Sequence, residues 1–422
     1  MTAIGTGPGR PVAFLGLRLL DGRRSDAVED GALLVGADGR IVAAGPARSV
    51  DVPADADRVD GGGSTLVPGL IDCHVHLVGA HERMDAFVQR SATDLVVRAL
   101  RTGRDYLESG VTTVRDAGGA MSGIRRAFAS GEMPGPRTQV SVNYLSQTGG
   151  HGDGWTPSGA DLNGILPPDL PDGICDGVDE CRKVARLQIR AGADWIKVMA
   201  TGGVYSLADS PDASQFTIDE IRAIVEEAEA AGIHGVLAHA EGTRGIKNAI
   251  RAGVRSIEHG DLIDEEGIDL LIARDIPLVP THLVVEEMLR PDRVEGGITP
   301  PWAVEKVGTL RARQRETFAE AVRRGVRIAM GTDGVNGSHL PTELALMVEC
   351  GMTPHASLRA ATLEAARLLG IAADVGTLEP GRLADLVLVA GDPLAAPTLW
   401  RDPARILLVA QDGRIVADRR GA

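Results

Sequence analysis

The sequence predicts an α/β protein in which a (β/α)8 TIM barrel is inserted into a small β-sandwich domain formed by both chain termini. Two observations predict it. Eight short apolar segments alternate with helical patterns through the middle of the 422-residue chain, and a similar hairpin motif occurs near each end. Strand–helix units that repeat eight times over about 260 to 270 residues are typical of such a barrel.

The two hairpin motifs predict the β domain. Residues 33–43 read LLVGADGRIVA and residues 407–417 read LLVAQDGRIVA, so each has an Asp-Gly turn between apolar strands. Asp-Gly suits a hairpin turn, which needs positive φ. Residues 384–389 add a strand beside the second hairpin. We therefore expect residues 1–66 and 374–422 to form the β-sandwich and residues 67–373 to form the barrel.

The expected barrel strands are apolar along most of their length, as strands buried on both faces are. They cover residues 66–76, 111–117, 138–145, 194–200, 235–240, 256–259, 276–281 and 326–331. Apolar residues at helical spacing predict helices between them, for example over 218–231 and 305–324. Two long connections, 146–177 and 283–301, are expected to be structureless lids or specificity loops, with solvated insertions as the alternative.

Composition limits the class of protein. There are 58 acidic and 44 basic residues, and a net charge of -14 argues against a nucleic-acid or anionic-membrane partner. No apolar run approaches the roughly 20 residues that span a bilayer, and residues 1–8 lack a signal-peptide pattern. The four cysteines form no metal-type pair and are expected to be reduced. We expect a cytoplasmic protein.

Polar residues at the strand ends predict a metal site. His74 and His76 end the first strand, and alternation places both on one face, where they can share an ion. Further polar residues occur in later strands: Lys197 within the fourth, His239 at the end of the fifth, His259 at the end of the sixth, and Asp333 after the eighth. Barrel active sites lie at the C-terminal strand ends, so these six groups should converge. Any single histidine could instead be a buried structural residue.

Lys197 is unusual because a charged lysine inside an apolar strand is costly unless it is paired. One interpretation is a structural ion pair with a neighbouring carboxylate. The other is carboxylation by carbon dioxide, which makes an anionic carbamate whose two oxygens can bridge two metals.

With these residues, the chain resembles the amidohydrolase superfamily over nearly its whole length. The tail 376–387 (GTLEPGRLADLV) also looks like that superfamily's exit from the barrel. Within it, the sequence is most similar to the imidazolonepropionase-like group that contains Xaa-Pro dipeptidases, related carboxypeptidases and ochratoxinase-type amidohydrolases. The segments that carry this similarity are 148–153 (TGGHGD), 197–204 (KVMATGGV) and 343–354 (ELALMVECGMTP).

The resemblance implies two divalent metal ions, zinc by default, although manganese or cobalt would suit similar ligands. It implies that His74 and His76 hold the more buried ion with Asp333, and that His239 and His259 hold the other. Carboxylated Lys197 and a hydroxide would bridge them. Asp333 would take the hydroxide's proton and pass it to the leaving amine.

The implied activity is hydrolysis of the amide or peptide bond of a small substrate with a free C-terminal carboxylate. A dipeptide, an N-acyl amino acid or an ochratoxin A-type amide would fit. His151, in a Gly-rich turn after the third strand, is expected to donate to the oxyanion. Tyr205 is a candidate contact for the substrate carboxylate, and His282 and His339 are candidate pocket residues; plain loop positions are the alternative. The histidines expected to be structural or exposed are His81, His234 and His355.

Other functions stay open at this point. A single-metal deaminase or a cyclic-amide, imidazolonepropionase-like hydrolase could use the same barrel, but a deaminase needs no bridge, and Lys197 argues against it. A non-catalytic scaffold would not need all six polar groups. The resemblance also suggests a homo-oligomer.

Overall fold

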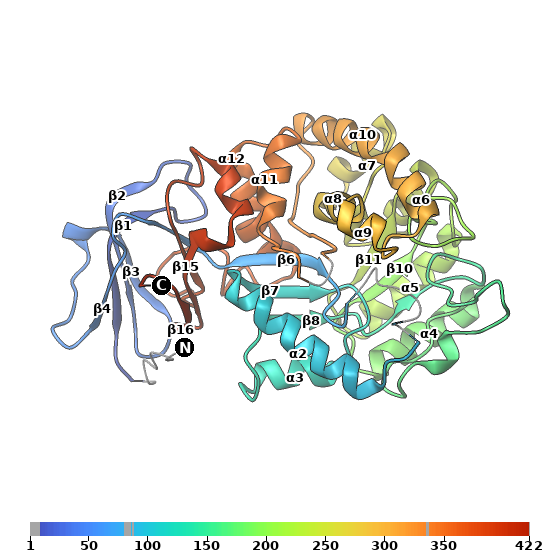
Figure 1. Cartoon of the computed structure of the whole chain (residues 1–422), viewed down its shortest axis with the longest axis horizontal. Coiled ribbons are helices and arrows are strands. Elements are labelled where there is room, and N and C mark those ends of the chain that lie inside the picture. The colour runs from blue at the N-terminus through green and yellow to red at the C-terminus, as the bar shows by residue number, and fades with distance from the viewer. Residues whose placement is uncertain (1–8, 80–85, 87, 335–336, 422) are drawn as a thin grey trace. The chain divides into compact units, whose positions relative to one another are not determined.

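The computed structural model describes residues 9–79, 86, 88–334 and 337–421 (Figure 1). The chain divides into two compact units. One comprises Met1–Asp72, Arg104–Thr113 and His339–Ala422, and the other comprises Cys73–Gly103 and Val114–Ser338. The domain boundaries expected after residues 66 and 373 stay a prediction. Residues 1–8 and His81, for which the sequence suggested roles, lie outside the described residues.

The first unit is built on a sheet that combines strands from both chain ends. Its strands are β1 (Val12–Leu19), β2 (Val28–Val35), β3 (Ile41–Pro46), β4 (Asp57–Asp60), β5 (Thr65–Pro68), β14 (Leu386–Val389), β15 (Ile406–Gln411) and β16 (Arg414–Asp418). They follow the order β16-β15-β14-β5-β1-β2-β3, with β4 beside β1. The unit also contains helices α11 (Thr342–Glu349), α12 (Pro354–Arg359) and α13 (Ala365–Leu368).

The hairpin turns of this sheet have the backbone that their sequence predicts. Asp412 and Gly413, between β15 and β16, have φ of 50° and 75°, and Gly39 in the first hairpin has φ of 79°. Alternate apolar residues of the strands, Phe14, Leu66 and Leu408 among them, form one buried cluster. This left-handed turn and this period-two pattern are what local sequence specifies for a hairpin.

Two further sheets carry the remaining strands. One has the order β6-β7-β8, with β6 (Leu70–Val75), β7 (Val111–Asp116) and β8 (Arg137–Val140) (Figure 1). The other has the order β13-β12-β11-β10-β9, with β9 (Tyr144–Leu145), β10 (Ile196–Met199), β11 (Val236–Ala240), β12 (Ser256–His259) and β13 (Leu278–Val279). All neighbours in the second sheet are parallel, which confirms the α/β class.

The expected third strand, 138–145, is interrupted. Val142 has φ of 64°, which turns the chain between β8 and β9. The expected eighth strand, 326–331, carries an isolated bridge rather than a regular ladder. The segment still forms backbone hydrogen bonds with a neighbour on each side. The Leu278 amide donates to the Arg327 carbonyl (2.9 Å), and the Cys73 amide donates to the Met330 carbonyl (2.8 Å).

Helices follow most strands of the second unit. They are α2 (Ala92–Glu108), α3 (Ser122–Ala129), α4 (Val178–Arg190), α5 (Ile218–Ala230), α6 (Thr243–Ala252), α7 (Glu265–Ala273), α8 (His282–Met288), α9 (Pro291–Glu295) and α10 (Pro301–Arg323). The helices expected at 218–231 and 305–324 are confirmed as α5 and α10. Helix α5 begins at a capping box of Thr217 and Glu220.

The expectation of a structureless loop at 283–301 was wrong, because α8 and α9 occupy much of it. The apolar side chains among residues 283–288 are buried along successive turns of α8. Pro291 is the first residue of α9, a position that proline favours. The segment 146–177 is largely irregular, as expected.

Two expectations from composition can be compared with the structure. All four cysteines are buried, reduced thiols, as expected. Within the described ranges, every helix is either too short or too polar to cross a bilayer.

Candidate metal centre

Three of the predicted ligands, His74, His76 and Asp333, come together within the second unit. Each offers one ligand atom, and these atoms lie within 4.8 Å of one another. Nε2 of His76 is 3.3 Å from Oδ1 of Asp333, and Nε2 of His74 is 3.9 Å from the same oxygen. The Asp333 amide also donates to the His74 carbonyl at 2.8 Å, which holds the aspartate beside β6. Two imidazoles and a carboxylate in this arrangement could hold a divalent cation.

Lys197 extends from β10 into the same cluster. Its Nζ lies 3.2 Å from Nε2 of His74, and the residue is 2% exposed. Burial lowers the pKa of Lys197 to about 8, against the opposing pull of the Glu258 and Asp333 charges. Among the residues that the structure describes, no carboxylate lies within ion-pair distance of Lys197. The structural ion pair that would make this lysine ordinary is therefore not formed.

His239 and His259 end the adjacent strands β11 and β12. Their ring centroids are 4.6 Å apart, and His259 is 5.1 Å from the His74 ring. Burial holds the pKa of both imidazoles well below the usual value, and neighbouring histidines add to this. Neutral imidazole is the form that binds metals. The structure thus brings four of the other five predicted groups around His74, and the fifth, His239, packs against His259.

A buried carboxylate orients His74. Nδ1 of His74 is 2.8 Å from Oε2 of Glu258, whose other oxygen accepts a 2.8 Å hydrogen bond from Arg115. Burial would raise the pKa of Glu258, but the Arg115 guanidinium and His74 hold it at about 2. The Arg115 guanidinium also lies 4.7 Å from the centroid of the Trp195 ring. This ionised carboxylate turns Nε2 of His74 toward the cluster.

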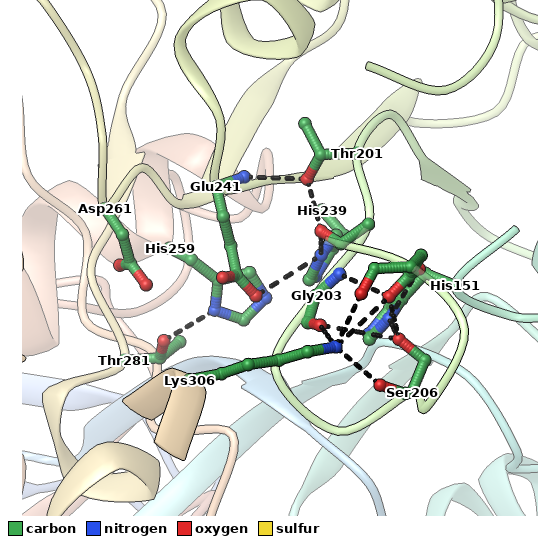
Figure 2. A network of polar contacts seen from close by, with 12 residues as sticks. His151, Thr201, Gly203, Ser206, His239, Glu241, His259, Asp261, Thr281 and Lys306 are labelled. Atoms are coloured by element: carbon green, nitrogen blue, oxygen red, sulfur yellow. Dashed lines mark hydrogen bonds and ion pairs between the residues drawn. The ribbon is translucent and has the colours of Figure 1, made fainter. Parts of the chain in front are cut away.

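The other imidazoles are also fixed through one nitrogen. Nδ1 of His76 is 2.7 Å from the Gly118 carbonyl, and Nδ1 of His259 is 2.7 Å from Oγ1 of Thr281 (Figure 2). His239 is reversed, because its Nε2 is 3.0 Å from the carbonyl oxygen of Gly202. Its Nδ1 is then the nitrogen available to a ligand. Such outer contacts set the tautomer and orientation of metal-binding histidines.

The backbone at three of these strand ends is left-handed. His259 has φ of 71°, Thr281 has φ of 53°, and Asp333 has φ of 48°. Non-glycine residues seldom adopt this region, and residues that do so cluster at functional sites. His259 is the last residue of β12, Thr281 follows β13, and Asp333 follows the segment 326–331.

His151 is held by a second network. Its Nδ1 is 2.8 Å from Oγ of Ser206 and 3.5 Å from Oδ2 of Asp209, and its ring stacks on His239 at 4.4 Å. Burial opposes the ionisation of Asp209, but His151 and Ser206 outweigh it and lower its pKa well below the ordinary range. Nζ of Lys306, from α10, donates to the carbonyl oxygens of Gly203, Ser206 and Asp209 at 3.0, 2.6 and 2.7 Å (Figure 2). This loop therefore positions His151 beside the histidine cluster.

A small cavity opens beside these groups. His151, His239, His259 and Asp333 line one part of it, and Tyr205 contributes to its wall. Apolar side chains from α8 and α10 line another part, and the carboxylates of Glu241 and Asp261 line a third. Burial and the charges of Asp261 and Asp209 raise the pKa of Glu241 well above its usual value, and burial raises that of Asp261 to about 7.

The remaining candidates lie elsewhere. His282 begins α8, is 2% exposed, and packs edge-on against Phe318 at 4.6 Å, outside the residues that line the cavity. His339 belongs to the first unit, where burial lowers its pKa to about 4. A substrate-binding role for both stays a prediction. His234 stacks on Trp195 at 5.5 Å, and His355 is half-buried.

Several residues of the site were not singled out from the sequence. Arg115 and Glu258 lie inside apolar strands, and a charge in such a strand is the same signal that identified Lys197. Asp209 and Lys306 carry no comparable signal, because each lies in a segment where charged residues are ordinary. Their role depends on how loop and helix meet.

Comparisons with known proteins identify the family of the chain. The model of the amidohydrolase family matches residues 65–416. Ochratoxinase from Aspergillus niger is 36% identical over 364 residues, covering 83% of this chain and 75% of its own length. Imidazolonepropionase from Symbiobacterium thermophilum is 28% identical, and the match covers 94% of this chain and 93% of that protein. A solved Xaa-Pro dipeptidase with methionine in its active site has a TM-score of 0.87 and 30% identity, covering 96% and 99%. The chain therefore belongs to the amidohydrolase family and is a hydrolase that acts on C–N amide bonds.

Proposed function

We propose that this enzyme is a binuclear metal-dependent amidohydrolase. Its substrate would be a small amide whose amine half is an amino acid with a free carboxylate. The observation that carries the proposal is the convergence of His74, His76 and Asp333 on one point, with Nζ of Lys197 3.2 Å from His74. A cationic lysine there would repel a metal, so the lysine must be modified for the cluster to work as a metal site.

The proposal includes a closed (β/α)8 barrel and a β-sandwich. The hydrogen bonds of residues 327–330 to Leu278 on one side and Cys73 on the other support closure, because they link the ends of the two open sheets. The shared apolar cluster of β1, β2, β5, β14 and β15 supports a sheet that folds over one core. In a closed barrel, five of the six predicted ligands lie at or near the carboxyl ends of strands, and Lys197 reaches them from within β10.

The donor set fits two divalent ions, zinc by default. His74, His76 and Asp333 would hold one ion, and His239 and His259 would hold the other. When bound, the ions would lower the pKa of a water and polarise the scissile carbonyl. The fixed opposite nitrogens of His74, His76 and His259 support this assignment, because each ring is oriented before any ligand enters.

Lys197 would bridge the two halves as a carbamate. The neutral Nζ attacks the carbon of carbon dioxide, an N–H proton leaves to solvent, and the product carries one negative charge. Its two oxygens can then contact both halves of the site. Burial of Lys197 favours the neutral amine that this addition requires.

Asp333 would transfer the proton, and His151 would stabilise the negative charge that develops on the substrate oxygen. Asp333 is 9% exposed at its side chain and lines the cavity, so it can accept a proton from the attacking water and return it to the leaving amine nitrogen. His151 lines the same cavity, with Nδ1 held by Ser206 and Asp209. It would stabilise the oxyanion through its other nitrogen.

The substrate class is supported by two relatives. The Aspergillus niger relative is an ochratoxinase, and the solved relative is a Xaa-Pro dipeptidase that holds methionine, an amino acid with a free carboxylate, in its active site. Tyr205 lines the cavity and is a candidate partner for that carboxylate. The similarity to an imidazolonepropionase keeps a cyclic-amide hydrolase as the alternative. The predicted homo-oligomer and cytoplasmic location stay predictions.

The proposal is tested by screening dipeptides, N-acyl amino acids, ochratoxin A and cyclic amides with metal-loaded and chelator-treated protein. We expect chelator-sensitive hydrolysis of acyclic amides with a free carboxylate, and about two metal ions per chain, as in two-metal hydrolases. His259→Asn should lose metal and activity, whereas the control His355→Gln, in the first unit, should keep both. Turnover of cyclic amides alone, with about one ion per chain, would favour the alternative.

A further inference from the structure

Glu241 places an unsatisfied carboxylate oxygen on the cavity wall. Its side chain is 4% exposed, and its Oε1 lies 3.5 Å from Nε2 of His239. Its Oε2 is buried and, within the described ranges, has no hydrogen-bond partner. A buried carboxylate oxygen without a donor is costly, and such groups in native proteins call for an explanation. A donor that arrives with a ligand would supply one.

Asp261 adds a second buried carboxylate to the same wall. It is 4% exposed, lines the cavity, and accepts a 3.0 Å hydrogen bond from the Gln314 side chain. In Figure 2 the side chains of Glu241 and Asp261 extend in the same direction from the ends of β11 and β12. In the part of the chain that the structure describes, no ion pair joins either carboxylate to a lysine or arginine. The nearby ammonium of Lys306 is committed to three carbonyl oxygens.

The rest of this wall is apolar. The side chains that line it from α8 and α10 are Val284, Val285, Met288, Val307 and Leu310. The first four belong to one buried apolar cluster. Paired acids beside an aliphatic wall match a group that has both an apolar stem and a charged end.

We propose that Glu241, Asp261 and this apolar wall form a subsite for a protonated nitrogen of the substrate. The subsite rests on the proposed amide hydrolysis and narrows its substrate class to cationic dipeptides or amides. Glu241 and Asp261 accept hydrogen bonds from the ammonium or guanidinium group. The nitrogen belongs either to a basic side chain, which the apolar wall favours, or to the free amino terminus of a dipeptide.

Matched substrates test the subsite on the unmodified protein. The pairs are leucyl-lysine with leucyl-norleucine, lysyl-leucine with norleucyl-leucine, and leucyl-leucine with its N-acetyl form. Each pair differs in one cationic nitrogen. We expect kcat/KM to favour the cationic member of at least one pair by about 10- to 100-fold, the range of a hydrogen bond to a charged group. The first two pairs report a side-chain nitrogen, and the third reports the amino terminus. Equal rates within every pair would overturn the subsite.

Variants connect the preference to these residues. In the preferred pair, kcat/KM for the cationic member divided by kcat/KM for the neutral member should fall toward one in Glu241→Gln and in Asp261→Asn. In the control Glu316→Gln, an exposed carboxylate on α10, the ratio should be unchanged. Metal content should not fall in Glu241→Gln. Loss of metal would assign Glu241 to the metal centre, and an unchanged ratio in both variants would also overturn the subsite.

Binding separates this inference from the proposed function. Calorimetry with lysine and norleucine measures recognition without turnover. Tighter binding of lysine, lost in Glu241→Gln, would support the subsite even if no amide were hydrolysed, in which case only the proposed function would fail. Hydrolysis of dipeptides with no cationic preference would remove the subsite and leave the proposed function in place.

Discussion

Nδ1 of His74 and Oε2 of Glu258 lie 2.8 Å apart in a fully buried contact. Glu258 stays ionised because Arg115 donates to its other oxygen. The contact therefore fixes the proton of His74 on Nδ1 and leaves Nε2 facing Asp333 and Lys197.

Glu258→Gln should weaken metal binding about 10- to 100-fold, the usual effect of removing an outer partner of a ligating histidine. The amide can still occupy the space, but it no longer holds a negative charge beside the imidazole. Competition with a chelator measures the affinity. Because the change also removes the charged partner of Arg115, Arg115→Gln is the companion variant. Equal metal affinity in Glu258→Gln and the unmodified enzyme would contradict this role.

Lys197→Ala should abolish turnover, since it removes the bridging group. Short carboxylic acids should partly restore it by placing two oxygens where the carbamate would be. Rates are measured with and without added acetate or propionate, and Lys247→Ala, which removes a lysine paired with Asp264 and Glu266, is the control. An unmodified lysine in a crystal structure with both metals bound would count against the carbamate.

Asp333→Asn should keep the fold and lose most of kcat, because an amide cannot accept the proton of the attacking water. A loss above tenfold corresponds to more than about 1.4 kcal/mol in the barrier. Since Asp333 is also a proposed ligand, metal content must be measured on the same sample. Turnover within tenfold of the unmodified enzyme would remove Asp333 from proton transfer.

Amidation of the substrate carboxylate should cut kcat/KM by about 10- to 100-fold, the value of one hydrogen bond to a charged group. The chain's net charge of -14 disfavours an anion at long range, so its recognition must be local. Tyr205→Phe should shrink the difference between free and amidated substrates if Tyr205 is the contact. Equal rates on both forms in the unmodified enzyme would point to a cyclic-amide or endo-acting enzyme.

His282 should make the protein less stable in acid. Burial lowers its pKa from 6.5 to about 4, so the unfolded chain binds the proton more readily than the folded chain. Its contribution is complete above pH 6.5 and is lost as the pH falls toward 4. The shift corresponds to at most about 3 kcal/mol. Urea unfolding at several pH values should show a shallower acid loss in His282→Leu than in His355→Gln; parallel curves would exclude this role.

The sequence predicted the α/β class and the convergence of His74, His76 and Asp333, which could hold a metal, because both follow from strand periodicity and strand order. Alternation alone puts His74 and His76 on one side of β6, and a parallel strand order brings the ends of β10, β11 and β12 together. Strand length was harder to predict, because the left-handed backbone at Val142 divides the third strand. Helices α8 and α9 were missed because a few apolar residues in one or two turns give little helical signal.

The positioning residues could not be predicted for a different reason. Lys306 matters because three carbonyl oxygens of one loop surround its ammonium, and nothing in the residues next to it specifies that contact. From the sequence alone, Glu241 is a turn carboxylate or a hydrogen-bonding partner just after the fifth strand. Its importance comes from the burial of one oxygen, which depends on tertiary packing.

At His259, Thr281 and Asp333, the left-handed backbone lowers the stability of the fold, while the side chain contributes to the candidate site. Each such residue costs about 1–2 kcal/mol relative to a relaxed conformation, and glycine would remove that cost. Glycine would also remove the imidazole, the hydroxyl or the carboxylate. A glycine that stabilised the fold at any of these positions would therefore weaken the proposed site, so stability and the proposed hydrolysis cannot both be improved there.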